Sequence, residues 1–169
     1  MYTREEIARV CRSFGGLLWL PAEIDGSKLL WAIAGCESSF GANCKPRHEQ
    51  YYHELAETHH NAEIVALTEK YGCGAHSSFG PWQELLVNCK PGTAPEDMAN
   101  LNRAALETVQ FINHRILEHE QAKTVKDIAA AYNSGKWRWV STPPGVIRYE
   151  NDCQKYYDAA ATEMPAAVV

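Results

Sequence analysis

A single carboxylate ends the most apolar stretch of this 169-residue chain. Residues 31–41 read WAIAGCESSFG, and Glu37 follows six uncharged residues. Leu29, Ile33 and Cys36 recur at the spacing of one helix face, and Glu37 lies on that face, four residues after Ile33. Burial disfavours the charged form of a carboxyl group and raises its pKa. We therefore expect Glu37 to keep its proton near neutral pH and to act as a general acid.

Two further segments place polar side chains next to predicted helices. Residues 75–83 read AHSSFGPWQ and are predicted to form an ordered loop, with a short helix after Pro81. Residues 130–135 read AAYNSG and end another helix, because Asn and Gly favour the left-handed conformation at a helix C-terminus. Together with Glu37 they would supply hydroxyl and amide groups for binding a polar substrate.

These three segments, in this order, resemble motifs of the lysozyme-like lytic transglycosylases and of their relatives, the goose-type lysozymes. In that family an ES dipeptide carries the catalytic glutamate, while a GLMQ-like and an AYNAG-like segment line the glycan groove. The corresponding stretches here are ES at 37–38, GPWQ at 80–83 and AYNSG at 131–135. Tyr149 matches a family tyrosine near the start of the final helix, so the resemblance covers about residues 28–157.

The resemblance implies a mostly α, lysozyme-like domain with minimal β-structure and a catalytic groove. It also implies cleavage of the β-1,4 bond between N-acetylmuramic acid and N-acetylglucosamine in peptidoglycan. Glu37 would be the acid/base, and the C6 hydroxyl of the substrate would close on the anomeric carbon to give a 1,6-anhydro product. No cofactor is implied, and the expected partner of the monomer is a peptidoglycan glycan strand. The expected substrate-binding residues are Ser38, Ser39, Gln83, Tyr132, Asn133 and Tyr149.

The chain departs from the family pattern in two places. Pro81-Trp82 stands where the family has Leu-Met, so the groove wall is expected to differ there. The segment of residues 41–76 is longer and contains more His than a minimal transglycosylase needs. Aromatic side chains at Trp82, Trp137 and Trp139 could stack on sugar rings, although they suit core packing equally well.

A hydrolase of the goose type is the alternative within the same fold. Hydrolysis requires a positioned water and therefore a second acid. Glu49 is the candidate, in the segment Arg47-His48-Glu49-Gln50, although an ion pair with Arg47 would explain it equally well. Glu54 and Glu57 are weaker candidates. A chitin-like polymer is the alternative substrate, and a glycan-binding module without activity is a further alternative.

A cluster of Cys and His side chains suggests a site of another class. Two Cys and two His can bind zinc tetrahedrally, which would make the chain a zinc-binding module or a metal-dependent amidase. His59 or His60 would then complete an open site, but the sequence has no His-Glu-x-x-His pattern. The candidate metal ligands are Cys44, His48, Cys73 and His76.

Composition limits the remaining classes. The net charge of −5 and the lack of a basic cluster argue against a nucleic-acid binder, and no apolar run approaches the ~18–20 residues of a membrane span. The start, MYTREEIARV, does not read as a signal peptide. We expect a protein that acts on the cell wall. It would be either a phage-encoded protein, released or carried on the virion, or a fragment of an exported enzyme. The six cysteines are expected to be reduced thiols, with three disulfides as the alternative.

The side chains above need helices to position them. The length of the chain and the lack of an internal repeat or a long linker predict one domain over residues 1–169, with a loose tail at 162–169. A capping box at Thr3–Glu6 starts the first helix, and Asp25 starts the second. The later predicted helices span 61–71, a stretch starting near 93–95, 102–119, a helix capped at 124 and broken at 133–135, and 146–161.

Overall fold

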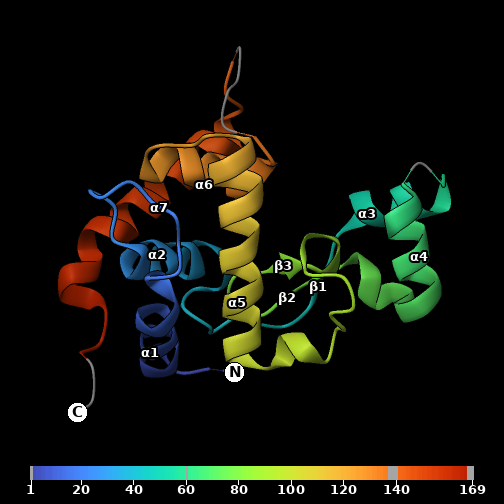
Figure 1. Ribbon diagram of the computed structural model, residues 1–169, viewed down its shortest axis with the longest axis horizontal. Coiled ribbons are helices and arrows are strands. Elements are labelled where there is room, and N and C mark those ends of the chain that lie inside the picture. Colours follow the sequence, from blue (N-terminus) through green and yellow to red (C-terminus); the bar gives the residue numbers. More distant parts are fainter. Residues whose placement is uncertain (1, 60, 137–140, 167–169) are drawn as a thin grey trace.

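Helices dominate the computed structural model, which describes residues 2–59, 61–136 and 141–166 (Figure 1). The mostly α prediction is confirmed. The α-helices are α1 (Arg4–Gly15), α2 (Gly26–Ser38), α3 (Gln50–Glu57), α4 (Ala62–Tyr71), α5 (Leu101–Phe111), α6 (Val125–Ser134) and α7 (Pro144–Glu163). The shorter or differently wound helices are η1 (Gly72–His76), η2 (Leu86–Asn88), η3 (Asp97–Ala99) and η4 (Ile112–His119), and the strands are β1 (Arg47–His48), β2 (Ser77–Phe79) and β3 (Glu84–Leu85).

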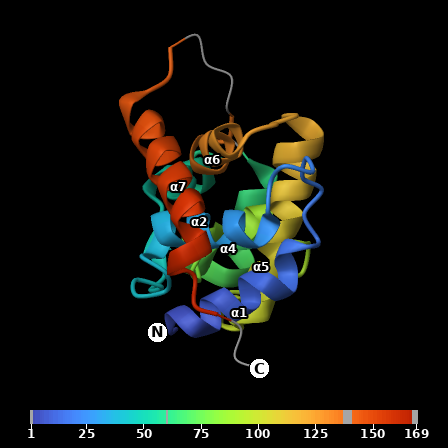
Figure 2. The same ribbon diagram turned by 90° about the vertical axis from the view of Figure 1, so that its left-hand side faces the viewer.

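Helix α2 lies at the centre of the core. Residues 29–34 are completely buried, because α1 covers one side of the helix and α7 covers another (Figure 2). A helix that is apolar on every side is stable only when it is surrounded. The sequence predicts one apolar face for this helix, whereas the structure buries nearly its whole circumference. Glu37 therefore comes at the end of the most enclosed helix of the molecule.

Helices α1 and α2 approach each other closely at two glycines. A Cβ atom on Gly15 would collide with the backbone of Ser27, and one on Gly26 would collide with the carbonyl of Gly15. The predicted capping box at Thr3 is confirmed, as is the Asp25 cap, whose carboxylate accepts from Ser27 N at 2.8 Å. The close approach at the two glycines and the Asp25 cap together fix where α2 starts. They therefore also set the position of its C-terminal end.

A three-stranded antiparallel sheet of order β1-β2-β3 lies beside the helical core, together with α3 and α4 (Figure 1). The prediction of a short helix directly after Pro81 is wrong. Gly80 and Gln83 adopt positive φ angles of 71° and 50°, so the chain turns there and enters β3. Strand pairing of Phe79 with Glu84 then closes the hairpin. The segment 41–61, which has no clear periodicity, supplies β1 and α3.

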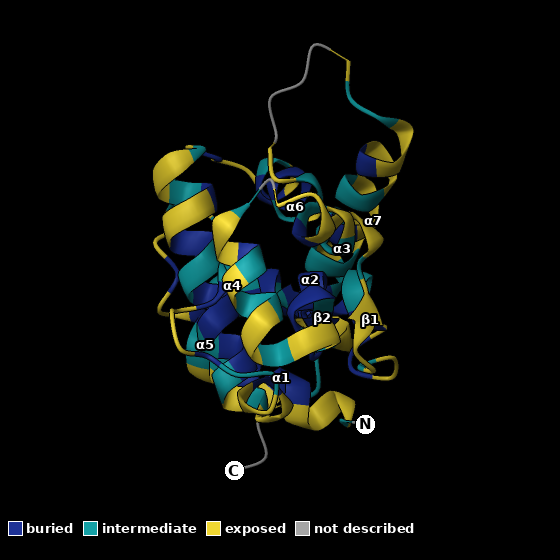
Figure 3. Cartoon of the chain, turned by 90° about the vertical axis from the view of Figure 1, so that its right-hand side faces the viewer, coloured by how far each residue is buried: buried dark blue, intermediate teal, exposed yellow. Residues whose placement is uncertain are grey.

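The helical stretch predicted to start near 93–95 forms only the short η3, whereas the later helices follow the sequence prediction closely. Helices α5 and η4 run continuously from 101 to 119, although the second half is wound as a π-helix. The Thr124–Asp127 capping box starts α6, and Gly135 ends it with a φ of 77°. Helix α7 continues to Glu163, two residues into the predicted loose tail, and Arg12 donates a hydrogen bond to the Pro165 carbonyl. Figure 3 shows that α3 and α4 are more exposed than α2 and α5.

Candidate functional site

A groove of about 570 Å³ lies between α5–η4 and α6 on one side and the sheet with α3 on the other. Of the predicted site residues, Glu37, Glu49, Gln83, Tyr132 and Asn133 all line it. Side chains separated by almost a hundred positions along the chain therefore meet at one place. The 131–135 segment contributes an entire stretch of wall, because α6 ends beside the groove.

Glu37 lines this groove, and its side chain is only 10% exposed. The Tyr149 hydroxyl donates a hydrogen bond to Glu37 Oε1 at 2.7 Å, and Arg47 Nη2 lies 4.0 Å from Oε2. Burial raises the pKa of Glu37, and the negative charge of Glu49 adds to this, while Tyr149 and Arg47 oppose it. The balance is a raised pKa, which favours a carboxyl group that can hold and deliver a proton.

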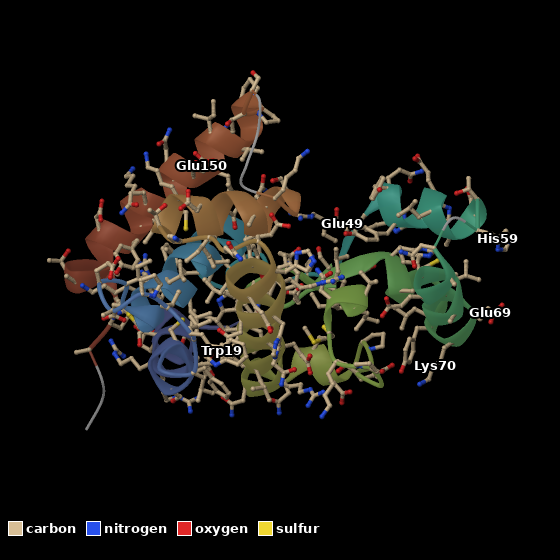
Figure 4. All side chains as sticks on the ribbon, turned by 45° about the horizontal axis from the view of Figure 1, so that its top comes forward. Trp19, Glu49, His59, Glu69, Lys70 and Glu150 are labelled. Atoms are coloured by element: carbon tan, nitrogen blue, oxygen red, sulfur yellow. The ribbon has the colours of Figure 1, made fainter. Side chains whose placement is uncertain are left out.

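Glu49 lies at the start of α3 and faces the groove (Figure 4). Its Oε1 accepts hydrogen bonds from Arg47 Nε at 2.8 Å and from Ser78 Oγ at 2.9 Å. Arg47 therefore lies close to both Glu37 and Glu49, and the ion pair with Glu49 considered from the sequence is present. Sequence reasoning did not assign Arg47 to the site. Its two-residue spacing from Glu49 was the available signal.

Gln83 and Tyr132 are held by the hairpin turn. Gln83 Nε2 donates to the Gly80 carbonyl at 2.8 Å, and Ser78 Oγ lies 3.0 Å from Gln83 Oε1. The Tyr132 hydroxyl donates to the Trp82 carbonyl at 2.7 Å, which ties α6 to the turn. Asn133 is exposed on the groove wall. Gln83 and Tyr132 are thus fixed by contacts within the protein.

Ser38 and Ser39 do not line the groove. Ser38 is buried, and its hydroxyl donates to the Ala34 carbonyl at 3.0 Å and accepts from Gly41 N at 2.9 Å. Ser39 ends α2 in the left-handed conformation with a φ of 51°. Both serines shape the end of α2. Trp82 is fully buried and donates to the Leu30 carbonyl at 2.9 Å, while Trp137 and Trp139 lie outside the described residues.

Glu84 is a groove residue that sequence reasoning missed. It follows Gln83 directly, lines the groove and is only 3% exposed. Asn88 Nδ2 donates to its Oε1 at 2.9 Å, and Oε2 lies 3.2 Å from the Tyr132 hydroxyl. Burial raises the pKa of Glu84 to about 7. Its position directly after the GPWQ segment was its only sequence signal.

The Cys and His residues do not form the predicted zinc site. Among the residues that the structure describes, no three His, Cys, Asp or Glu side chains are grouped so that they could hold a metal ion. Cys44 donates to the Gly41 carbonyl at 3.1 Å, and Cys73 is exposed. His48 and His76 lie with His53 in a cluster of imidazole rings, where His53 Nδ1 is 3.2 Å from His76 Nδ1. His59 lies between α3 and α4 and points away from the groove (Figure 4). His60 lies outside the described residues.

Two further observations complete this description. Within the described ranges, no helix is both long and apolar enough to cross a membrane. Comparison of the chain with protein-family models, with curated proteins and with solved structures finds no match. The function must therefore be inferred from the groove itself.

Proposed function

We propose that this protein is a peptidoglycan-cleaving glycosidase with a lysozyme-like fold, acting on the cell wall with Glu37 as general acid/base. The observation that carries the proposal is Glu37 itself, a nearly buried carboxyl that lines the groove and accepts a hydrogen bond from Tyr149. The groove also brings together parts of the three segments on which the family resemblance rests. A glycan strand is an extended chain, and a groove with polar walls suits it.

The chemistry follows from the protonation state of Glu37. The protonated carboxyl would donate to the bridging oxygen as the bond from C1 of N-acetylmuramic acid to that oxygen breaks. The resulting carboxylate of Glu37 would then accept the proton of the C6 hydroxyl as the oxygen of that hydroxyl bonds to C1. One acid/base is sufficient for both steps, and the product carries a 1,6-anhydro ring. This lytic transglycosylase reaction is the form we favour, because Glu49 is already engaged by Arg47 and Ser78.

A hydrolase is the second candidate. Glu49 lines the same groove, and its two hydrogen bonds from Arg47 and Ser78 both go to Oε1. Its Oε2 could therefore orient a water toward the anomeric carbon, as an inverting mechanism requires.

Mass spectrometry of the products distinguishes these reactions. Purified peptidoglycan and chitin oligosaccharides are digested in parallel, and the new chain ends are identified. We expect anhydro-muramic ends from peptidoglycan and no cleavage of chitin. Reducing ends would indicate the hydrolase, cleavage of chitin would change the substrate, and no cleavage of either polymer would overturn the proposal.

A further inference from the structure

The carboxyl group of Glu84 lies among hydrogen-bonding groups whose protons can be counted. Its Oε1 accepts from Asn88 Nδ2 at 2.9 Å and from Leu85 N at 3.3 Å. Its Oε2 lies 3.2 Å from the hydroxyl oxygen of Tyr132. A contact between a hydroxyl and a carboxyl oxygen needs one proton, and either group can supply it.

The proton of Tyr132 is already committed to another acceptor. Its hydroxyl lies 2.7 Å from the Trp82 carbonyl, which has no proton to give and can only accept. Thr108 also borders the Tyr132 hydroxyl, and its own hydroxyl donates to the Ala104 carbonyl at 3.0 Å. With the Tyr132 proton directed to Trp82, the contact to Glu84 Oε2 is satisfied when Glu84 carries the proton.

Burial of Glu84 favours the neutral carboxyl and outweighs the hydrogen bonds from Asn88 and Leu85 N, which favour the charged form. The titratable groups that face it are Glu37 from α2, Tyr52 from α3, Tyr132 from α6 and Cys89 after η2, and none of these is a cation. Helix α5 also packs on β3, but its charged residues Arg103 and Glu107 pair with each other at 2.6 Å. Two basic side chains of η4, Arg115 and His119, line the groove and are exposed to solvent. Among the residues that the structure describes, no cation pairs with Glu84; a 3%-exposed carboxylate in that setting is costly, so the proton stabilises the folded state.

We propose that Glu84 acts as a neutral carboxylic acid, a positioning residue that donates to the Tyr132 hydroxyl and keeps a second negative charge away from Glu37. This role rests on the proposed function, in which Glu37 becomes a carboxylate when it protonates the bridging oxygen. A negative Glu84 would oppose that step, because like charges at close range disfavour each other. A neutral Glu84 leaves Glu37 free to give up its proton and fixes the groove wall at the same time.

The protonation state is measured directly by titrating the glutamate carboxyl carbons of ¹³C-labelled protein by NMR. In the parent we expect the Glu84 signal to titrate near the raised pKa of about 7. In Glu37→Gln the midpoint should fall, because the charge of Glu37 raises the pKa of Glu84. A midpoint at the ordinary glutamate value, or one that does not respond to Glu37→Gln, would overturn the proposal. Neither readout requires substrate, so they decide about Glu84 even if the protein does not cleave peptidoglycan.

The role in turnover is tested with two variants of Glu84. The amide in Glu84→Gln is neutral at every pH and can still donate to Tyr132, whereas Glu84→Leu removes the donor. We expect kcat to fall about tenfold in Glu84→Leu, the scale of one lost hydrogen bond, and to recover most of this loss in Glu84→Gln. If Glu84→Gln loses as much activity as Glu37→Gln, Glu84 works as an ionised base and the proposal is wrong. If Glu37→Gln keeps full activity, the proposed function fails, and the NMR titration still reports on Glu84.

Discussion

The Tyr149 hydroxyl donates a 2.7 Å hydrogen bond to Glu37 Oε1, joining residues 112 positions apart. Tyr149 lies on α7 and Glu37 on the last turn of α2, so the packing of these two helices sets the orientation of the carboxyl. A hydrogen bond to the charged form lowers the pKa of a carboxyl, and here it opposes the effect of burial. Tyr149 therefore limits how far the pKa of Glu37 rises.

Replacing Tyr149 by Phe should shift the pH dependence of activity. Loss of this hydrogen bond raises the pKa of Glu37, so its acid form persists to higher pH. The alkaline limb of kcat/KM should therefore move up, with about a three- to tenfold loss at the optimum. Tyr157→Phe is the matched control. Tyr157 also lies on α7, but its hydroxyl accepts a hydrogen bond from Asp25 N and does not contact Glu37. An alkaline limb that stays in place or moves down would contradict the assignment.

Replacing Glu49 by Gln should move the same limb in the opposite direction. The negative charge of Glu49 raises the pKa of Glu37, so its removal lowers that pKa. For a transglycosylase we expect the rate to fall by about tenfold or less, because Arg47 loses one partner but the acid/base remains. A loss of about 10²-fold or more would instead show that Glu49 takes part in the chemistry, as a hydrolase requires.

The folded state should lose stability as the pH rises. The pKa of Glu84 is raised to about 7, so between its ordinary value and 7 the folded protein binds a proton that the unfolded chain has released. The stabilisation is complete at low pH and is lost as the pH rises through about 7, with a limit of about 3 kcal/mol. Urea unfolding at pH 5 and pH 8 should show this decrease in the parent and a smaller one in Glu84→Gln. Glu63→Gln, at an exposed position on α4, should keep the parent's decrease.

The close approach of α1 and α2 should tolerate no added methyl group. Gly15→Ala would place a Cβ atom against the backbone of Ser27, and we expect it to lower the free energy of unfolding by about 1–3 kcal/mol. Gly16→Ala is the matched control, because no atom lies within 4 Å of the added Cβ and its φ of −68° suits alanine. Thermal unfolding of both variants measures the difference. Equal stability of the two would contradict the close helix contact.

Capping residues and helical periodicity predict most of the helices. The boxes at Thr3 and Thr124 and the run from 102 to 119 each mark an element that the structure contains. The hairpin of β2 and β3 was missed, because its turn depends on positive φ angles at Gly80 and Gln83, and the pairing of β2 with β1 joins segments about 30 residues apart. Local propensity does not report such pairing, which is formed only when distant segments meet.

The site was partly predictable for a similar reason. Glu37 could be recognised because the apolar helix before it indicates burial, and Gln83 and Tyr132 because they belong to short motifs. Glu84 could not be found this way. Its importance comes from burial against α6 and from the Trp82 carbonyl that takes the Tyr132 proton, and both are tertiary contacts.

The central claim is that Glu37 performs the acid/base step, and the rate of glycan cleavage by Glu37→Gln tests it most directly. The substitution keeps the size of the side chain and removes its transferable proton. On purified peptidoglycan, with Glu63→Gln as the exposed control, we predict that Glu37→Gln releases products about 10²–10⁴-fold more slowly than the parent, while the control keeps the parent rate. Cleavage by Glu37→Gln at the rate of the parent would contradict the account.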